Sequence, residues 1–207
     1  MKHNRAHAPR KRLVIATANA GKLREFRAGL AGLPFAVDGQ SALGVEPPEE
    51  TGSSFLSNAL LKARHAAAAT GAAAIADDSG LEVDALGGAP GIHSARYAGV
   101  GADDAMNNAK LLAALAGRPL LERRARYRCA LVFVDGPQDP APVWAEGVWE
   151  GYVLDAPRGS GGFGYDAYFW LPDLEVTAAQ LEPEEKNRRS HRGKALRSLI
   201  ELLAARA

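Results

Sequence analysis

The sequence predicts a mixed α/β fold. Short apolar runs typical of strands alternate with longer segments in which apolar residues recur at helical spacing. Two long alternating segments, residues 125–134 and 143–153, are separated by a connection containing Pro137 and Pro140, which favours an antiparallel hairpin. The chain has 207 residues, of which 47% are apolar and 24% charged, so it can bury a substantial core as one folded unit.

The first half of the chain predicts three strands and two helices. A strand at 13–17 leads into a helix at 22–32, where Phe26 and Leu30 mark an apolar face, and a short strand follows at 35–37. An alanine-rich helix is expected at 54–70, with Ser53 or Ser54 as its cap, and a strand of small apolar residues at 73–76.

The second half predicts a helix at 103–116, the two hairpin strands at 125–134 and 143–153, and a strand at 167–170 that ends before Pro172. A terminal helix is expected at 190–205. Its apolar face is predicted to consist of Ala195, Leu199, Leu202 and Leu203.

Two adjacent carboxylates follow the strand at 73–76, in the sequence Asp77-Asp78-Ser79-Gly80, which we expect to form a turn. Carboxylates at the rim of a sheet can hold a hard divalent cation or an attacking water. Asp, Ser and Gly are also ordinary turn residues, so this motif alone is structural more often than catalytic.

A possible phosphate-binding turn, Thr17-Ala18-Asn19-Ala20-Gly21-Lys22, joins the first strand to the first helix. It offers backbone N–H groups, the positive end of the helix dipole and an ammonium group. It is not the usual P-loop, which would need glycine at Ala16 and a hydroxyl at Leu23. A plain helix N-terminus with a solvated lysine is the alternative.

Three further segments carry candidate chemistry. Glu49 and Glu50 precede the second helix, and their carboxylates could meet a cation at Asp78. The loop at 159–166 matches the G-x-G-x-x-G pattern, but a strand follows it, so it favours close approach of a flat ligand to Phe163 and not a dinucleotide. Segment 186–193 gathers many hydrogen-bond donors.

Five segments together resemble the inosine triphosphate pyrophosphatase family, and the resemblance runs from Leu13 to the C-terminus. They are TANAGKLREF, EETGSSFLSNALLKARHAA, ADDSGLEVDALGGAPGIHSARYAG, GSGGFGYDAYF and EEKNRRSHRGKAL. The resemblance implies hydrolysis of non-standard purine nucleoside triphosphates (XTP, ITP and dITP) to the monophosphate and pyrophosphate, with Mg²⁺ as cofactor. It also implies an elongated α/β structure with a long central mixed sheet, two lobes and a cleft between them, usually as a homodimer.

The resemblance also implies roles for individual residues. Asp78 is the expected proton acceptor, and Glu50 and Asp78 are the expected magnesium ligands. The triphosphate is expected at Thr17, Ala18, Asn19, Ala20, Gly21, Lys22 and Ser79, and the nucleoside at Phe163, Gly164, Tyr165, Asp166, Lys186, His191 and Arg192. Many relatives have glycine where this chain has Ala18. Spacing alone does not show which of Asp77 and Asp78 is held on the metal and which faces the water.

Other function classes are less well supported. A nucleic-acid-binding module using Arg188, Arg189 and Arg192 is the alternative from a different class, but the net charge is only +1 and carboxylates sit at the candidate site. A related pyrophosphatase with another base preference is the second enzyme alternative. We expect no nucleic-acid or membrane partner.

Three further expectations concern the single cysteine, the cellular location and the N-terminal residues. Cys129 lies in an alternating strand pattern and is expected in the core. No apolar run approaches the roughly 20 residues of a membrane span, and the basic start lacks the apolar stretch of a signal peptide, so a cytoplasmic location is expected. Residues 1–12 are expected to form a disordered basic arm, ahead of a single domain at 13–207.

Overall fold

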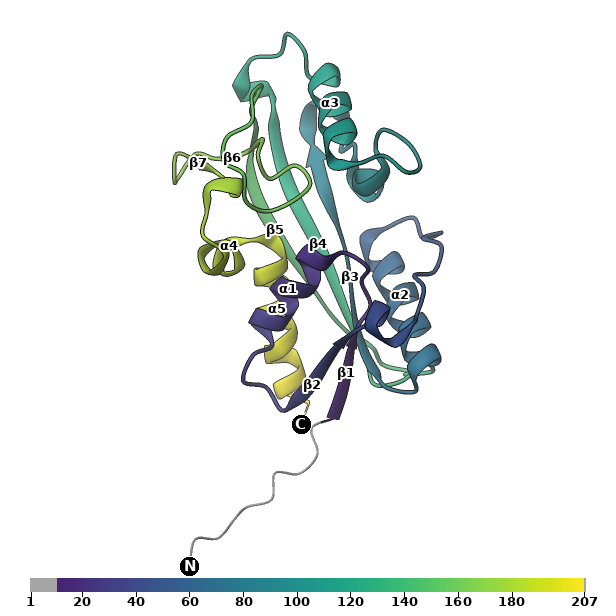
Figure 1. Cartoon of the computed structure of the whole chain (residues 1–207). Helices are drawn as coiled ribbons and strands as arrows, with labels where there is room; N and C mark the ends of the chain where they lie inside the picture. The colour runs from purple at the N-terminus through teal and green to yellow at the C-terminus, as the bar shows by residue number, and fades with distance from the viewer. Residues whose placement is uncertain (1–10, 207) are drawn as a thin grey trace, which may run out of the picture.

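The computed structural model describes residues 11–206. Its framework is one seven-stranded mixed sheet with the strand order β2-β1-β3-β4-β5-β6-β7. The molecule is elongated, and the long strands β3, β4 and β5 run along its length (Figure 1). The predicted mixed α/β class with a long central sheet is confirmed.

The sheet combines a parallel and an antiparallel part. β1 pairs in parallel with β2 and β3, and every later neighbouring pair is antiparallel. The strands are β1 (Lys11–Ile15), β2 (Phe35–Gly39), β3 (Ala73–Val83), β4 (Arg124–Val134), β5 (Val143–Val153), β6 (Phe169–Leu171) and β7 (Val176–Thr177).

The helices begin at side-chain caps in most cases. Asn19, Ser54, Asp103 and Ser190 each accept a hydrogen bond from a backbone N–H in the first turn of the helix that follows. The helices are α1 (Ala20–Gly29), α2 (Phe55–Thr70), α3 (Asp104–Ala114), α4 (Pro183–Arg189) and α5 (His191–Ala204). The short 3₁₀ turns are η1 (Gln40–Leu43), η2 (Asp84–Leu86), η3 (Gly91–Arg96), η4 (Leu120–Glu122) and η5 (Ala178–Gln180).

Three buried clusters give the molecule two lobes. In the lower lobe of Figure 1, α1 and α5 cover one face of the sheet through Phe26 and Leu199, and α2 covers the other through Ala59 and Ala63. In the upper lobe α3 packs through Leu111 against the far ends of β3, β4 and β5. Both lobes therefore share the same long strands.

Several boundaries differ from the prediction. β1 begins at Lys11, so Lys11 and Arg12 pair with β2 and do not belong to an N-terminal arm; the rest of the predicted arm, residues 1–10, lies outside the described part of the chain. The strand expected at 167–170 begins at Phe169. The terminal helix expected at 190–205 has Ala195 and Leu199 in the core, but Leu202 is 46% exposed.

The predicted turn at Asp77–Gly80 is wrong. β3 continues to Val83, because the segment pairs with β4 without interruption, from Ala74 opposite Val134 to Val83 opposite Ala125. β1, in contrast, ends at Ile15, opposite Ile75. Between Ala76 and Leu81, β3 therefore has no second strand partner in residues 11–206, and this open edge faces the region where the two lobes meet.

The described residues contain no helix that is both long and apolar enough to cross a membrane.

Candidate active site

Asp77 and Asp78 point to opposite faces of the sheet, because successive side chains of a strand alternate. Asp77 faces α1 and α5, where Lys22 Nζ lies 3.0 Å and Arg192 Nη2 3.2 Å from its Oδ2. Asp78 faces α2, where its Oδ1 lies 2.8 Å from Lys62 Nζ and Asn58 Nδ2 donates to its Oδ2 at 3.2 Å. The open edge of β3 brings both carboxylates to one site from two sides.

The two carboxylates have opposite pKa shifts. Burial alone would raise the pKa of Asp77, but Lys22 and Arg192 hold it well below its usual range. Burial raises the pKa of Asp78, and Lys62 only partly opposes this effect, while the charge of Glu50 adds to it. Asp77 is thus a fixed anion, and Asp78 is the more basic of the pair.

Glu50 and Asp78 share one ammonium group. Lys62 Nζ lies 2.8 Å from Glu50 Oε1 and 2.8 Å from Asp78 Oδ1, and Arg96 Nη1 lies 2.9 Å from the other oxygen of Glu50. Burial would raise the pKa of Glu50, but Lys62 and Arg96 lower it overall, so this carboxyl is ionised.

This donor set fits a magnesium ion. Two carboxylates converge on one cationic group, and Mg²⁺ is commonly held by one or two carboxylates while substrate phosphates and waters complete its coordination. Within residues 11–206 no three His, Cys, Asp or Glu side chains are grouped as a metal cage. Glu50 and Asp78 are the described residues that could hold such an ion.

The segment from Thr17 to Lys22 follows β1 as predicted, but α1 begins at Ala20, two residues earlier than expected, so Lys22 lies in the first turn of the helix. Asn19 caps the helix by accepting from Lys22 N at 3.0 Å, and its own N–H donates to Thr17 Oγ1 at 3.2 Å. Ala18 does not require the conformation of glycine, because Glu175 is the only non-glycine residue with positive φ in the described chain. From this first helical turn, the Lys22 side chain reaches Asp77.

A cavity of about 100 Å³ lies beside the start of α1, and all seven predicted nucleoside residues line it. Asp166 anchors it: its carboxylate is 2.6 Å from Lys186 Nζ and accepts hydrogen bonds from Phe163 N at 2.9 Å and Tyr127 OH at 3.3 Å. Its lining residues are Asn19, Lys22, Ser79, Gly80, Ser94, Ala95, Asp104, Asn107, Tyr127, Phe163, Gly164, Tyr165, Asp166, Lys186, His191 and Arg192.

Aromatic rings line the cavity. His191 stacks on Tyr127 with ring centroids 4.6 Å apart and planes 10° apart. Burial and the neighbouring cation Arg192 hold the pKa of His191 well below its usual value, so its ring is neutral. Lys186 Nζ lies 4.7 Å from the ring centroid of Phe163, and Arg192 Cζ lies 5.8 Å from it.

The structure also corrects the expected setting of Lys186. The terminal helix begins after Ser190, close to its predicted start, but the preceding residues form a separate helix, α4, that was not predicted. Lys186 lies on α4, whereas His191 and Arg192 open α5, whose first turn Ser190 caps through Gly193 N at 3.1 Å. The bend between α4 and α5 aims these three side chains into one cavity.

Sequence reasoning missed several side chains of the site, and four of them contact its charged groups directly. Lys62 and Asn58 lie four residues apart on the inward face of α2, and such a polar pair within an alanine-rich stripe was a detectable signal. Glu25, on α1, lies 3.1 Å from Lys186 Nζ and pairs with Arg192. Tyr127 resembles an ordinary core residue of β4 and gave no signal.

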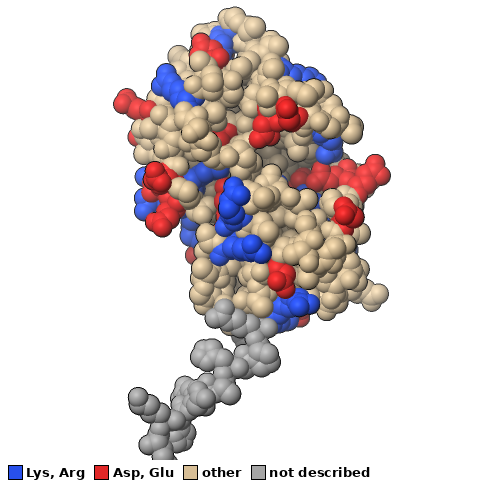
Figure 2. All heavy atoms as spheres, viewed as in Figure 1, with Lys and Arg blue, Asp and Glu red and all other residues tan. Residues whose placement is uncertain are grey.

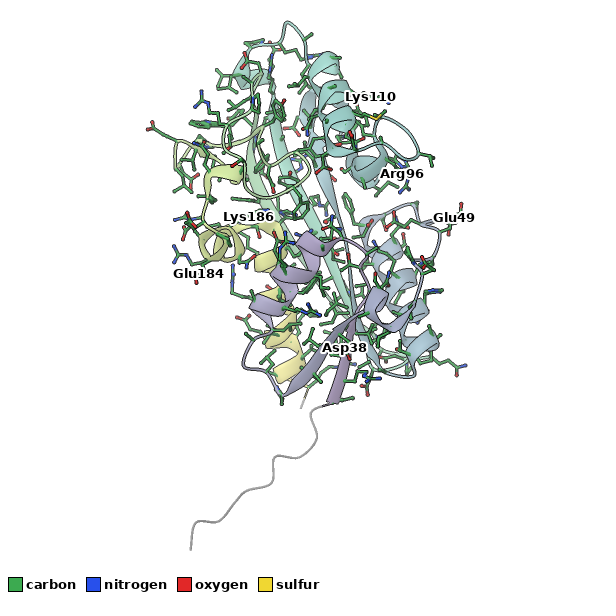
Figure 3. All side chains as sticks on the ribbon, in the orientation of Figure 1. Asp38, Glu49, Arg96, Lys110, Glu184 and Lys186 are labelled. Carbon is green, nitrogen blue, oxygen red and sulfur yellow. The ribbon has the colours of Figure 1, made fainter. Side chains whose placement is uncertain are left out.

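The site opens between the lobes. Figure 3 shows Arg96 on the upper lobe across from Glu49, which lies next to Glu50 on the loop before α2, and Lys186 near the middle of the molecule. Figure 2 shows lysine, arginine and acidic side chains interspersed on this face, and no single sign of charge dominates it.

Comparison with known proteins agrees with this geometry. Residues 13–202 match the model of the Ham1 family. The chain is 56% identical to a dITP/XTP pyrophosphatase of Thioalkalivibrio sulfidiphilus, over 94% of this chain and 100% of that protein, and 54% identical to one of Methylococcus capsulatus, over 95% and 98%.

Solved structures are similar over nearly the whole chain. A HAM1 protein from Coxiella burnetii superimposes with a TM-score of 0.86 at 45% identity, covering 94% of this chain and 99% of that one. The Ham1 protein of Staphylococcus aureus gives a TM-score of 0.83 at 41% identity, covering 95% and 100%. This chain therefore belongs to the Ham1 family.

Proposed function

We propose that this protein hydrolyses non-standard purine nucleoside triphosphates, namely XTP, ITP and dITP, to the monophosphate and pyrophosphate. The observation that carries the proposal is the placement of Asp77 and Asp78 on two sides of one strand, between a cationic helix start and an aromatic cavity rich in donors. The dITP/XTP pyrophosphatases that share more than half of their residues with this chain support the same substrate class.

The residues divide into a phosphate end and a base end. The turn from Thr17 to Lys22, together with Ser79, binds the triphosphate through backbone N–H groups, the helix dipole and the ammonium of Lys22. Phe163 offers its ring face to the purine. Gly164, Tyr165, Asp166, Lys186, His191 and Arg192 surround the base and sugar.

Asp78 accepts the proton of the attacking water. The oxygen of this water attacks the α-phosphorus. The bond between the α-phosphorus and the bridging oxygen breaks, and pyrophosphate leaves with the bond electrons. The raised pKa of Asp78 suits this role, whereas Asp77 remains ionised and orients Lys22 and Arg192. A bound Mg²⁺ at Glu50 and Asp78 would supply charge neutralisation on the phosphate oxygens.

The proposal includes a homodimer and a cytoplasmic location. Both follow from the resemblance to the pyrophosphatase family, and a cytoplasmic location agrees with substrates drawn from the free nucleotide pool. It includes no nucleic-acid partner. Arg192 is 3% exposed and paired with Asp77, and Arg188 and Arg189 both pair with Glu185.

Pyrophosphate release from a panel of triphosphates tests the proposal. ITP, XTP and dITP should be hydrolysed with Mg²⁺, and a buried site that donates to the carbonyl at purine position 6 should discriminate against ATP by roughly 10⁴–10⁵. Chelation of divalent ions should abolish turnover. Equal rates with ATP and ITP, or full activity with chelator, would contradict the proposal.

A further inference from the structure

Two side chains of α3 hold the peptide groups of Gly164 from both sides. Gly164 N donates to Asp104 Oδ2 at 2.6 Å, and Asn108 Nδ2 donates to Gly164 O at 2.9 Å. Gly164 has φ +63°, a conformation that favours glycine. Because both polar groups of this residue are bonded to one helix, its place relative to α3 is fixed.

The adjacent Phe163 is thereby held between two lobes. A Cβ built on Gly21 would lie 2.6 Å from Phe163 Cδ1, so the ring lies directly against the phosphate turn of the lower lobe. The backbone of Phe163 is tied to Asp166 through its N–H at 2.9 Å. The peptide on its other side is the one that Asp104 holds from the upper lobe.

We propose that Asp104 and Asn108 are positioning residues that set the ring of Phe163 for stacking on the purine base. The inference rests on the proposed function, in which the base occupies this cavity. Their side-chain hydrogen bonds go to Gly164 and to the backbone of α3, and not to Lys22, Asp77 or Asp78, so we expect their effect at the base end of the substrate. Base stacking on an aromatic side chain changes affinity by about 5- to 100-fold, which bounds the expected effect.

The test compares ligands for the two ends of the site. Asp104→Ala and Asn108→Ala should raise the inhibition constant of IMP and the KM for ITP about tenfold. The inhibition constant of inorganic tripolyphosphate and the kcat for ITP should stay within about twofold. Asp104→Asn keeps an acceptor oxygen for Gly164 N and should recover most of the affinity for IMP.

Asp103→Ala is the matched control. Asp103 caps the same helix by accepting from Met106 N at 2.8 Å but does not contact Gly164. This variant should lower the melting temperature, as loss of a cap does, and leave both inhibition constants unchanged. If Asp103→Ala reproduced the loss of affinity for IMP, the role of Asp104 would be that of a helix cap and the inference would be overturned.

A further variant, Phe163→Ala, separates this inference from the proposed function. The positioning role is refuted if Phe163→Ala weakens the binding of IMP but Asp104→Ala does not. It is also refuted if Asp104→Ala weakens the binding of IMP and of tripolyphosphate equally. In both cases ITP hydrolysis by the unaltered enzyme still stands. If Phe163→Ala leaves the affinity for IMP intact, the base does not stack on Phe163, and the positioning role is refuted as well. Failure of the unaltered enzyme to hydrolyse ITP would contradict the proposed function itself.

Discussion

At the scale of single residues, Asp77 and Asp78 show how two neighbours acquire different chemistry. The side chain of Asp77 is 1% exposed and surrounded by Lys22, Arg192 and the hydroxyl of Ser79, so it is stabilised as an anion. Asp78 contacts one ammonium and one amide and lies near a second carboxylate. The sequence could indicate that this pair was chemically active. The division of labour depended on which side chain faces which helix.

Asp78→Asn should lower kcat for ITP by about 10²–10⁴, the usual effect of removing a general base, while the protein stays folded. Asparagine keeps the shape of the side chain, and Lys62 retains its partner Glu50. Steady-state kinetics and circular dichroism would measure the two effects. A kcat within a factor of three of the original would remove Asp78 from the proton-accepting role.

At the scale of elements, local patterns predicted the hairpin of β4 and β5 and the alanine-rich α2 well. Both have strong periodicity that their packing does not override. β3 was cut short because Asp-Asp-Ser-Gly has the composition of a turn, whereas a continuous pairing with β4 keeps it extended. The start of α5 after Ser190 was predicted, but α4 was not, because its seven residues are mostly charged and show no apolar periodicity.

The inward face of α2 carries the next prediction. Lys62→Met keeps the length of the side chain but removes the ammonium that joins Glu50 to Asp78. The two carboxylates should then repel each other, and kcat/KM for ITP should fall by about 10²–10³, the range found when one electrostatic donor is removed from an active site. Kinetics with ITP at saturating Mg²⁺ would measure the change.

Arg64→Met is the control for this helix. Arg64 lies two residues away on the exposed face and bonds only Asp139 O, at 3.3 Å, among the described residues. It should leave kcat/KM for ITP within a factor of two. An equal loss in both variants would show that the effect comes from the helix and not from the ammonium of Lys62.

At the scale of the whole molecule, a line of alternating charges ties the base end of the site to the phosphate end. Asp166 contacts Lys186, Lys186 contacts Glu25, and Glu25 pairs with Arg192. Arg192 then contacts Asp77, which contacts Lys22. Periodicity could not predict this arrangement, because it joins elements more than 100 residues apart in the chain. The two lobes and their cleft were accessible only through the family resemblance.

Asp77 links β3 to both α1 and α5, so its replacement should lower the stability of the whole fold. Asp77→Asn leaves Lys22 and Arg192 without their shared anion. Breaking a buried ion pair costs about 3–5 kcal/mol, which corresponds to a melting temperature lower by about 10 °C at pH 7 for a chain of this size.

The loss should depend on pH with a definite sign. Burial opposes ionisation of Asp77, but Lys22 and Arg192 keep its folded pKa below the unfolded value of about 3.9. A carboxylate with a depressed folded pKa contributes its full stability above the unfolded pKa and loses it as the pH falls further. The difference in melting temperature between the original protein and Asp77→Asn should therefore be constant from pH 7 to about pH 5 and shrink below about pH 4. Asp78→Asn should show no such shrinkage, since the folded pKa of Asp78 is raised. A difference for Asp77→Asn that persisted unchanged to pH 3 would show that hydrogen-bond geometry, and not the charge of Asp77, holds α1 and α5 to β3.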